Sequence, residues 1–314
     1  MNEFAAITCF FSYAKNPYAV ERFIEFKDHL KKQGVDLYVI ELAFFDEEYL
    51  LDEKDIYLRL RTESVLWHKE SLLNTLVKRL PPHIKKIAWL DGDIIIQEDN
   101  WAEECAELLD VRPLIQIGHQ YLFEEKDGRW LAKHTVGRAC QDPDRSPADF
   151  RSHHVGLGWA ANREFFDKVG LFDYDITGSG DTILFYSAGS FWESSCSRWL
   201  RTVYDKQYKS IYYHLEDYIN KCNNFFGQKK VAETIGYVHS IVRHGYHGNL
   251  QRRGYVSRLD LLKGISLRSD LTRDKQGLLE WVDKKSNEPF KRFFLMKDED
   301  SDEPCNYHHI NKLK

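Results

Sequence analysis

The chain has 314 residues, 43% of them hydrophobic and 14% aromatic, which indicates a globular protein with a large core and excludes an intrinsically disordered one. Its net charge is −5 with acids and bases intermixed, which argues against a protein that binds nucleic acid by bulk charge. Six scattered cysteines without a CxxC pair, and no apolar run of roughly 18 residues, predict a soluble, cytoplasmic protein without a disulfide framework or a membrane span.

The first elements in chain order suggest a βαβ unit. The continuous apolar run 5–11 predicts a strand buried on both faces, residues 18–32 have apolar side chains at helical spacing, and 35–42 predict a second strand. Ligands bind at the carboxyl ends of such parallel strands, which places Phe10, Phe11 and Ser12 near a site. Core packing alone would also account for at least one of the two phenylalanines.

The central feature of the sequence is Asp91-Gly92-Asp93, which lies between two apolar runs in residues 87–96. Side chains at i and i+2 of an extended chain share a face, so the two carboxylates point the same way, and hard oxygen ligands suit Mg²⁺ or Mn²⁺. Asp-Gly between apolar runs is also a strong β-hairpin signal. Residues 62–80 predict a helix just before this strand, so Asp91 ends a β-α-β sequence, which favours the binding edge over the hairpin.

The middle of the chain gives weaker signals. Residues 101–109 predict a helix, 113–117 a strand, and the polar stretch 118–150 a long loop with acceptor recognition as a candidate role. Gly156-x-Gly158-x-x-Ala161 matches the dinucleotide fingerprint only weakly, because the residues before it make a poor strand. Residues 162–169 predict a helix, and the glycine-rich loop 170–181 ends at Asp181, which opens another helix either as a simple N-cap or as an acid facing a ligand.

The last third combines histidines and arginines. A strand from residue 236 leads into His239, His244 and His247, and Arg252, Arg253 and Arg258 follow. Such groups beside a metal-binding acid pair suit a diphosphate; a solvated basic face around one buried histidine is the alternative. We expect a catalytic domain over residues 1–258, a helical extension packed on it over 259–296, and a charged, flexible tail over 297–314.

Taken together, these motifs over roughly residues 5–282 resemble glycosyltransferases of the GT-A fold. Asp91-Gly92-Asp93 is similar to the DxD metal motif of that family, and Trp67-x-Lys69-Glu70-x-x-x-Asn74 to the helix that precedes it. Residues 158–173 are similar to the segment that shapes the acceptor site, and Gly178-Ser-Gly-Asp181 lies where many inverting members have an acidic base. His244-Gly-Tyr-His247-Gly and Arg253-x-Tyr255-x-x-Arg258 resemble the segment near the nucleotide.

The resemblance implies an α/β, Rossmann-like GT-A fold with a mostly parallel central sheet flanked by helices and a C-terminal helical extension. It implies metal-dependent, inverting, galactosyltransferase-like transfer of a hexose from a UDP-linked nucleotide sugar to a hydroxyl of a glycan or other acceptor. Asp181 would be the general base. The implied donor-binding residues are Phe10, Phe11, Ser12, Lys69, Asp91, Gly92, Asp93 and Arg253. The implied acceptor-binding residues are His154, Gly158, Trp159 and Gly180, and the implied Mn²⁺ or Mg²⁺ ligands are Asp91, Asp93 and either His247 or His244.

Two features depart from the family pattern. Inverting galactosyltransferase-like members usually have consecutive acids at the base position, whereas Thr182 follows Asp181 here, and two histidines compete for one metal-ligand position. Two other classes remain open. A metal-dependent nucleotidyltransferase or phosphohydrolase would need more clustered acids than the single close pair, and a non-catalytic sugar-binding module would not need the acid at Asp181.

Overall fold

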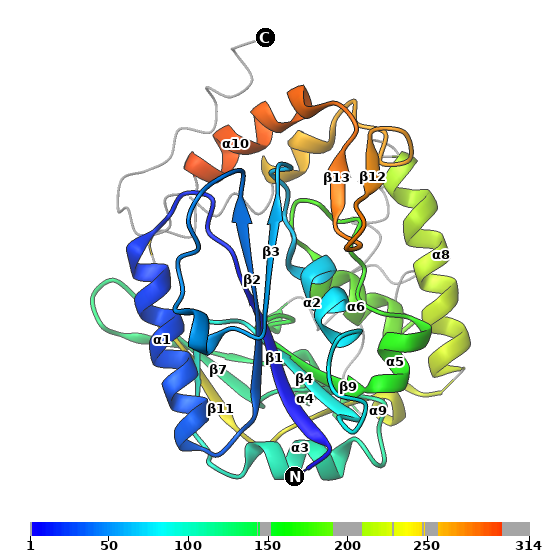
Figure 1. The fold of residues 1–314 in the computed structure, drawn as a ribbon. Helices are drawn as coiled ribbons and strands as arrows, with labels where there is room; N and C mark the ends of the chain where they lie inside the picture. The colour runs from blue at the N-terminus through cyan, green and yellow to red at the C-terminus, as the bar shows by residue number, and fades with distance from the viewer. Residues whose placement is uncertain are drawn as a thin grey trace.

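The protein folds around a twisted seven-stranded sheet flanked by helices (Figure 1). The computed structural model describes residues 2–142, 144, 152–190, 209–227, 229–246, 248 and 257–296. Along the sheet the strand order is β10-β6-β9-β4-β1-β2-β3. The strands are β1 (Phe4–Phe10), β2 (Leu37–Phe44), β3 (Leu58–Thr62), β4 (Lys86–Leu90), β6 (Leu114–Gln116), β9 (Gly158–Asn162) and β10 (Ile235–Tyr237). Only β9 runs antiparallel to its neighbours, so the sheet is mostly parallel.

The central strands are apolar on both sides because helices cover both faces of the sheet. One face packs on α1 (Pro17–Lys32) and α3 (Trp101–Leu108), through side chains such as Phe23 and Trp101. The other face packs on α2 (Lys69–Val77), α4 (Val136–Cys140), α5 (Arg163–Lys168), α6 (Gly180–Ala188), α8 (Lys209–Phe226) and α9 (Val231–Thr234). Adjacent residues of β1 alternate between these cores, with Ala6 in the first and Ile7 in the second. The prediction of an α/β fold with a mostly parallel central sheet flanked by helices is confirmed.

A second sheet lies beyond the end of β4, with the order β5-β11-β7-β8. Its strands are β5 (Ile94–Ile96), β7 (Gln120–Glu124), β8 (Trp130–His134) and β11 (Ile241–His244). The chain passes from the first sheet into the second through Asp91-Gly92-Asp93, because β4 and β5 belong to different sheets. The β-hairpin interpretation of this stretch is therefore wrong. Thr8 Oγ1 donates a hydrogen bond to Leu90 O (2.8 Å) and Asp91 N to Leu157 O (2.8 Å), which fixes the crossing point.

The long loop predicted over residues 118–150 is wrong for the described part of this segment. It contains the β7–β8 hairpin and α4, and the turn between the strands closes through a hydrogen bond from Gly128 N to Glu125 O (2.9 Å). Four of the five residues of β8 are exposed, so the strand lacks the apolar alternation that would have revealed it. Residues 143 and 145–151 lie outside the described part of the chain.

The helix predicted over residues 62–80 is shorter, since α2 begins at Lys69 and Thr62 ends β3. Tertiary partners take the backbone groups between them: Val65 N donates to Asn287 Oδ1 (2.7 Å) and Trp67 N to Ile176 O (3.0 Å). These bonds replace the helical ones that the apolar spacing suggested.

The C-terminal extension is partly helical. It contains two short 3₁₀ helices, η4 (Ser257–Leu262) and η5 (Lys284–Ser286), and α10 (Asn287–Met296). Between them, β12 (Leu271–Arg273) and β13 (Leu279–Trp281) form a hairpin where helices were predicted. Asp274 Oδ1 accepts hydrogen bonds from Gln276 N and Leu278 N (both 2.8 Å), and this turn directs the chain back as a strand. The tail 297–314 lies outside the described residues.

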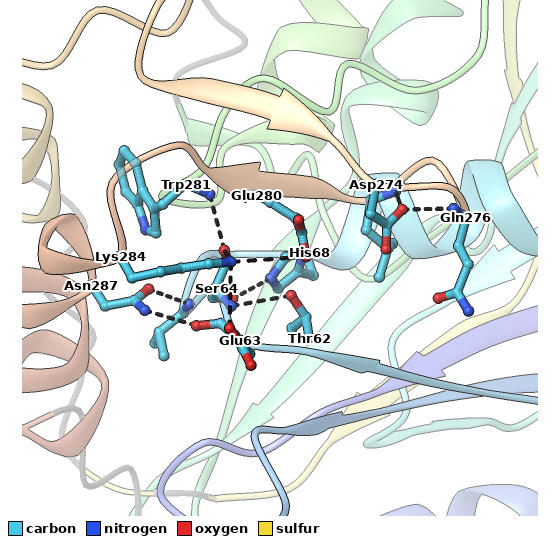
Figure 2. Close-up of polar contacts among 12 residues, drawn as sticks. Thr62, Glu63, Ser64, His68, Asp274, Gln276, Glu280, Trp281, Lys284 and Asn287 are labelled. Carbon is cyan, nitrogen blue, oxygen red and sulfur yellow. Dashed lines mark hydrogen bonds and ion pairs between the residues drawn. The ribbon is translucent and has the colours of Figure 1, made fainter.

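The extension is attached to the segment between β3 and α2 by a group of polar contacts (Figure 2). Asn287 Nδ2 donates to Glu63 O (2.7 Å), and its Oδ1 accepts the bond from Val65 N. Ser64 Oγ accepts from Trp281 N (2.9 Å), and His68 Nε2 bonds Ser64 O (2.8 Å). We call Ser64, His68, Trp281 and Asn287 the clamp.

Within the part of the chain that the structure describes, no helix is both long enough and apolar enough to cross a membrane.

Candidate active site

A cleft of about 720 Å³ opens at the carboxyl ends of β1 and β4. This is the edge where ligands bind in parallel α/β sheets. The cleft brings together most of the predicted site residues from distant parts of the sequence. They are Phe10, Phe11 and Ser12 at the end of β1 and just after it, Lys69 at the start of α2, and Asp91, Gly92 and Asp93 after β4. The others are His154 before β9, Gly180 and Asp181 at the start of α6, and His244 at the end of β11.

Lys69 is the electrostatic centre of the cleft. Its Nζ lies 2.6 Å from Asp91 Oδ1 and 3.1 Å from Asp181 Oδ2, so it joins the end of β4 to the start of α6. Burial alone would lower the pKa of Lys69, but the charges of Asp181 and Asp91 hold that pKa well above its ordinary value. Burial raises the pKa of Asp91, and Lys69 opposes this shift. Lys69 is therefore a fixed cation between two carboxyl groups.

Glu70 lies beside this pair and lines the cleft, although its side chain is almost fully buried. Burial raises the pKa of Glu70 to about 8, against the opposing effect of Lys69, so its carboxyl group is mostly neutral at pH 7. A Cβ atom on Gly180 would lie 2.1 Å from Glu70 Oε1. The absence of a side chain at Gly180 is what allows Glu70 to fit against the first turn of α6.

The loop before α6 is held by packing and hydrogen bonds. Gly178 has φ +93°, and a Cβ there would lie 2.9 Å from the Trp67 indole, so a glycine is required on both counts. Ser179 is the N-cap residue of α6, and its Oγ accepts a hydrogen bond from Arg258 Nη2 (3.0 Å). Asp181 is the second residue inside the helix, which corrects the expectation of a simple N-cap. From there its carboxylate faces Lys69 and the cleft.

Asp93 and His244 form the second polar pair of the cleft. Asp93 Oδ2 lies 3.5 Å from His244 Nε2, and His244 is buried beside the Phe123 ring at a centroid distance of 5.4 Å. A carboxylate and an imidazole are donors that Mn²⁺ accepts, so the pair fits part of a divalent metal site. Asp91 faces Lys69 instead. The described residues contain no group of three or more His, Cys, Asp or Glu side chains arranged to hold a metal, and His247 lies outside them.

Three other predicted residues, Gly92, His154 and Arg253, differ in their placement. Gly92 packs on Phe23 of α1, where a Cβ would lie 3.1 Å from the phenyl ring. His154 lines the cleft and its Nδ1 accepts a hydrogen bond from Gly156 N (3.1 Å), while a Cβ at Gly156 would approach both His154 and Asp181. Arg253 lies outside the described part of the chain.

Gly158 and Trp159 are the predicted acceptor-binding residues that the structure does not bring to the cleft. They lie in β9, where Trp159 is fully buried and its Nε1 donates to Val155 O (2.8 Å). A Cβ at Gly158 would lie 2.9 Å from Leu90, so this glycine permits close packing of β9 on β4. The prediction of direct acceptor contact by these two residues is corrected, because β9 is inserted into the sheet rather than placed along its edge.

Several residues that line the cleft were not predicted from the sequence. Tyr18 and Arg22 of α1, Phe123 of β7, and Phe294 and Leu295 of α10 all line it. Helical spacing predicts α1 but does not show that its first turns border a cleft, and nothing local in the sequence links α10 to residues near 91. Arg258 also lines the cleft, as the basic cluster and the Arg253-x-Tyr255-x-x-Arg258 pattern had suggested.

No family model matches the chain, and no curated protein matches its sequence. Among solved structures, it is similar to the catalytic domain of Drosophila β1,4-galactosyltransferase 7 in complex with xylobiose, with 16% identity and a TM-score of 0.35. That match covers 59% of this chain and 59% of the Drosophila chain. A second structure of the Drosophila enzyme, with manganese, UDP-Gal and xylobiose, gives the same identity and TM-score over 58% of this chain and 59% of that one.

Two further solved structures are similar over more of the chain. A putative glucose-1-phosphate thymidylyltransferase from Bacillus anthracis, in complex with sucrose, is 11% identical with a TM-score of 0.35, over 87% of this chain and 98% of that one. A glycosyltransferase involved in glycosylation of the major capsid of PBCV-1 is 12% identical with a TM-score of 0.25, over 77% of this chain and 93% of that one. Glycosyltransferases therefore occur among the structural neighbours, at a similarity too low to assign an activity.

Proposed function

We propose that the protein is a glycosyltransferase that moves a sugar from a nucleotide-diphosphate sugar, UDP-linked, to a hydroxyl group of a glycan or another acceptor. One observation carries this proposal: Lys69 holds Asp91 and Asp181 together at the carboxyl edge of the sheet, while Asp93 faces His244 in the same cleft. This arrangement supports two separate tasks. One end of the cleft is suited to a divalent cation and a diphosphate, and the other to accepting a proton.

The donor end is built from β1, α1 and the Asp91–Asp93 turn. Asp93 and His244 would hold Mn²⁺ or Mg²⁺, with His247 as a further candidate ligand, and the metal would neutralise the leaving diphosphate. Phe10, Phe11 and Ser12 line the adjoining part of the cleft, with Arg22 of α1 nearby. An apolar wall beside a guanidinium group suits a nucleotide, whose base is planar and whose phosphates are anionic.

Asp181 is the proposed general base. An acceptor hydroxyl is too weakly acidic to attack unaided, so Asp181 would take its proton as the new oxygen–carbon bond forms. The bond between the anomeric carbon and the phosphate oxygen breaks, and its electrons leave with the diphosphate. Lys69 Nζ lies 3.1 Å from Asp181 Oδ2 and keeps that carboxyl group directed into the cleft. Attack from the face opposite the leaving group would invert the anomeric configuration.

The decisive experiment is a ligand screen by thermal shift and product analysis. We expect UDP-sugars with Mn²⁺ to raise the Tm, and slow release of UDP in the absence of acceptor. Asp93→Ala should lose the Mn²⁺-dependent rise while keeping the parental Tm without ligand. Asp99→Ala is a matched control, because Asp99 is an exposed acid outside the cleft walls.

Two results would redirect the proposal. Turnover of nucleoside triphosphates in preference to UDP-sugars would indicate a nucleotidyltransferase or phosphohydrolase. Binding of a UDP-sugar without any release of UDP would indicate a sugar-binding module. A parental response to Mn²⁺ and nucleotide in Asp93→Ala would remove Asp93 from the metal site.

A further inference from the structure

The pleat of the β7–β8 hairpin gives it two chemically different faces. Tyr121 and Phe123 of β7 point to one side, together with Lys133 and Leu131, which are their cross-strand partners on β8. We call this the inner face, because Phe123 lines the cleft. Trp130 and its neighbours at even-numbered positions point to the opposite, outer face, where Trp130 packs against Arg243 at 4.5 Å.

The inner face continues the floor of the cleft outward. The Phe123 ring lies 4.9 Å from His154 and 5.4 Å from His244, between centroids, so it borders the proposed reaction centre. One strand further out, Leu131 is 46% exposed, and Lys133 Nζ lies 5.7 Å above the Phe123 ring. Neighbouring strands are about 4.8 Å apart, so this surface extends the floor by roughly the width of one sugar ring.

The chemistry of this surface matches a sugar. A pyranose presents an apolar face of C–H groups, which can pack on Phe123 and Leu131, and a rim of hydroxyl oxygens, which can accept hydrogen bonds from the ammonium group of Lys133. The residues proposed to contact the nucleotide lie at and just after the end of β1 and on α1, whereas Leu131 and Lys133 lie on β8. The inner face begins on the side of the cleft where His154 and the proposed base, Asp181, lie on either side of Gly156.

We propose that the acceptor is an oligosaccharide of at least two sugar units, and that the inner face of the β7–β8 hairpin binds the unit next to the reacting one. Phe123 and Leu131 contact the ring of that unit, and Lys133 donates to its hydroxyls. This inference rests on the proposed glycosyltransferase activity and adds the acceptor class and three residues that determine it.

The test compares acceptors of different length in the full-length protein. UDP-sugars and Mn²⁺ are incubated with a panel of free monosaccharides and neutral oligosaccharides of two to six units, and products are identified by mass. We expect kcat/KM for the preferred acceptor of two or more units to exceed that for its terminal monosaccharide at least tenfold. Leu131→Ala and Lys133→Ala should each reduce this advantage about five- to tenfold through a higher acceptor KM, with donor KM and kcat unchanged.

Trp130→Ala is the matched control, because Trp130 precedes Leu131 on the same strand, is also exposed, and points to the outer face. All three positions are on the surface, so we expect the Tm to change little, and its measurement separates folding from binding. Leu131→Met keeps the apolar contact and should restore the long-acceptor preference.

Several outcomes would overturn the inference. Equal kcat/KM for monosaccharides and oligosaccharides would do so, as would an equal loss in Trp130→Ala and Leu131→Ala. UDP release that is stimulated by a peptide, but by none of the saccharides, would indicate a polypeptide acceptor paired along the edge of β8. No UDP-sugar turnover under any condition would instead contradict the proposed transferase itself, so the two failures are distinguishable.

Discussion

Two polar clusters meet at the short segment that connects β3 to α2. The clamp holds the segment itself, and the cluster in the cleft begins at Lys69, the first residue of α2. In the clamp, neutral side chains bond to backbone groups: Asn287 to Val65 N and Glu63 O, and Ser64 Oγ to Trp281 N. In the cleft, charged side chains bond to one another, with Lys69 between Asp91 and Asp181. The clamp satisfies backbone groups that its own burial removes from water, so it fixes geometry.

The cleft cluster has the opposite character. Its groups remain partly accessible, with side-chain exposures of 12% for Lys69, 29% for Asp91 and 21% for Asp181, so their charges can act on a ligand. His68 and Lys69 are adjacent in sequence but serve the two clusters separately. The segment between β3 and α2 is therefore held by neutral hydrogen bonds to the extension, and it leads directly into Lys69, a cation that faces the cleft.

The largest expected effect comes from removing one charge of the cleft. Asp181→Asn keeps the size of the side chain and an oxygen that can accept from Lys69, but loses the general base. We expect turnover to fall by about 10²–10⁴. Binding of the UDP-sugar should change little, since the base acts on the acceptor, and thermal shift provides that control. Parental turnover, or a product that keeps the anomeric configuration of the donor, would show that Asp181 is not the base of an inverting transfer.

The second expected effect is a pH dependence of the stability of the protein, caused by His68 of the clamp. Burial lowers the pKa of His68 to about 4, and its Nδ1 has no hydrogen-bond partner among the described residues. The unfolded chain therefore binds a proton on His68 between about pH 6.5 and 4 that the folded chain does not bind. Stability should be complete above pH 6.5 and fall as the pH drops, by on the order of 3 kcal/mol at pH 4.

Denaturant unfolding at a series of pH values measures this slope. His68→Gln removes the titrating group and should flatten the curve between pH 6.5 and 4. The exposed His83 offers a matched control, and His83→Gln should keep the parental slope. An unchanged slope in His68→Gln would mean that other groups produce the acid sensitivity.

The smallest expected effect comes from removing the Asn287 side chain, which takes part in the clamp. Asn287→Ala leaves Val65 N without its acceptor in a buried position and should lower the free energy of unfolding by about 2 kcal/mol. Glu288→Ala, which removes only an exposed ion pair with Lys291, should change it by less than about 0.5 kcal/mol. If the clamp positions Lys69, the Asn287 variant should also bind the UDP-sugar more weakly. Parental stability in Asn287→Ala would show that the extension is not held through this residue.

Much of the fold could be predicted from the sequence. The continuous apolar run of β1 reflects burial on both faces, and the apolar spacing of α1 reflects burial of one face. Both are local patterns, and they predicted a parallel α/β sheet. The position of Asp91 and Asp93 after an apolar strand also placed them at the edge where ligands bind. The β7–β8 hairpin could not be predicted in the same way, because an exposed strand needs no apolar alternation.

The site itself was decided by tertiary structure. The sequence alone placed acids, a lysine and three histidines in separate segments, and their chemical types suggested a metal and a base. Only the fold brings Lys69 to Asp181, 112 residues away, and places His244 beside Asp93, while His239 stacks on His119 at 4.5 Å between ring centroids. The physical reason is that burial patterns are repeated locally along a chain, whereas a charge pair depends on where two distant segments end in the folded sheet.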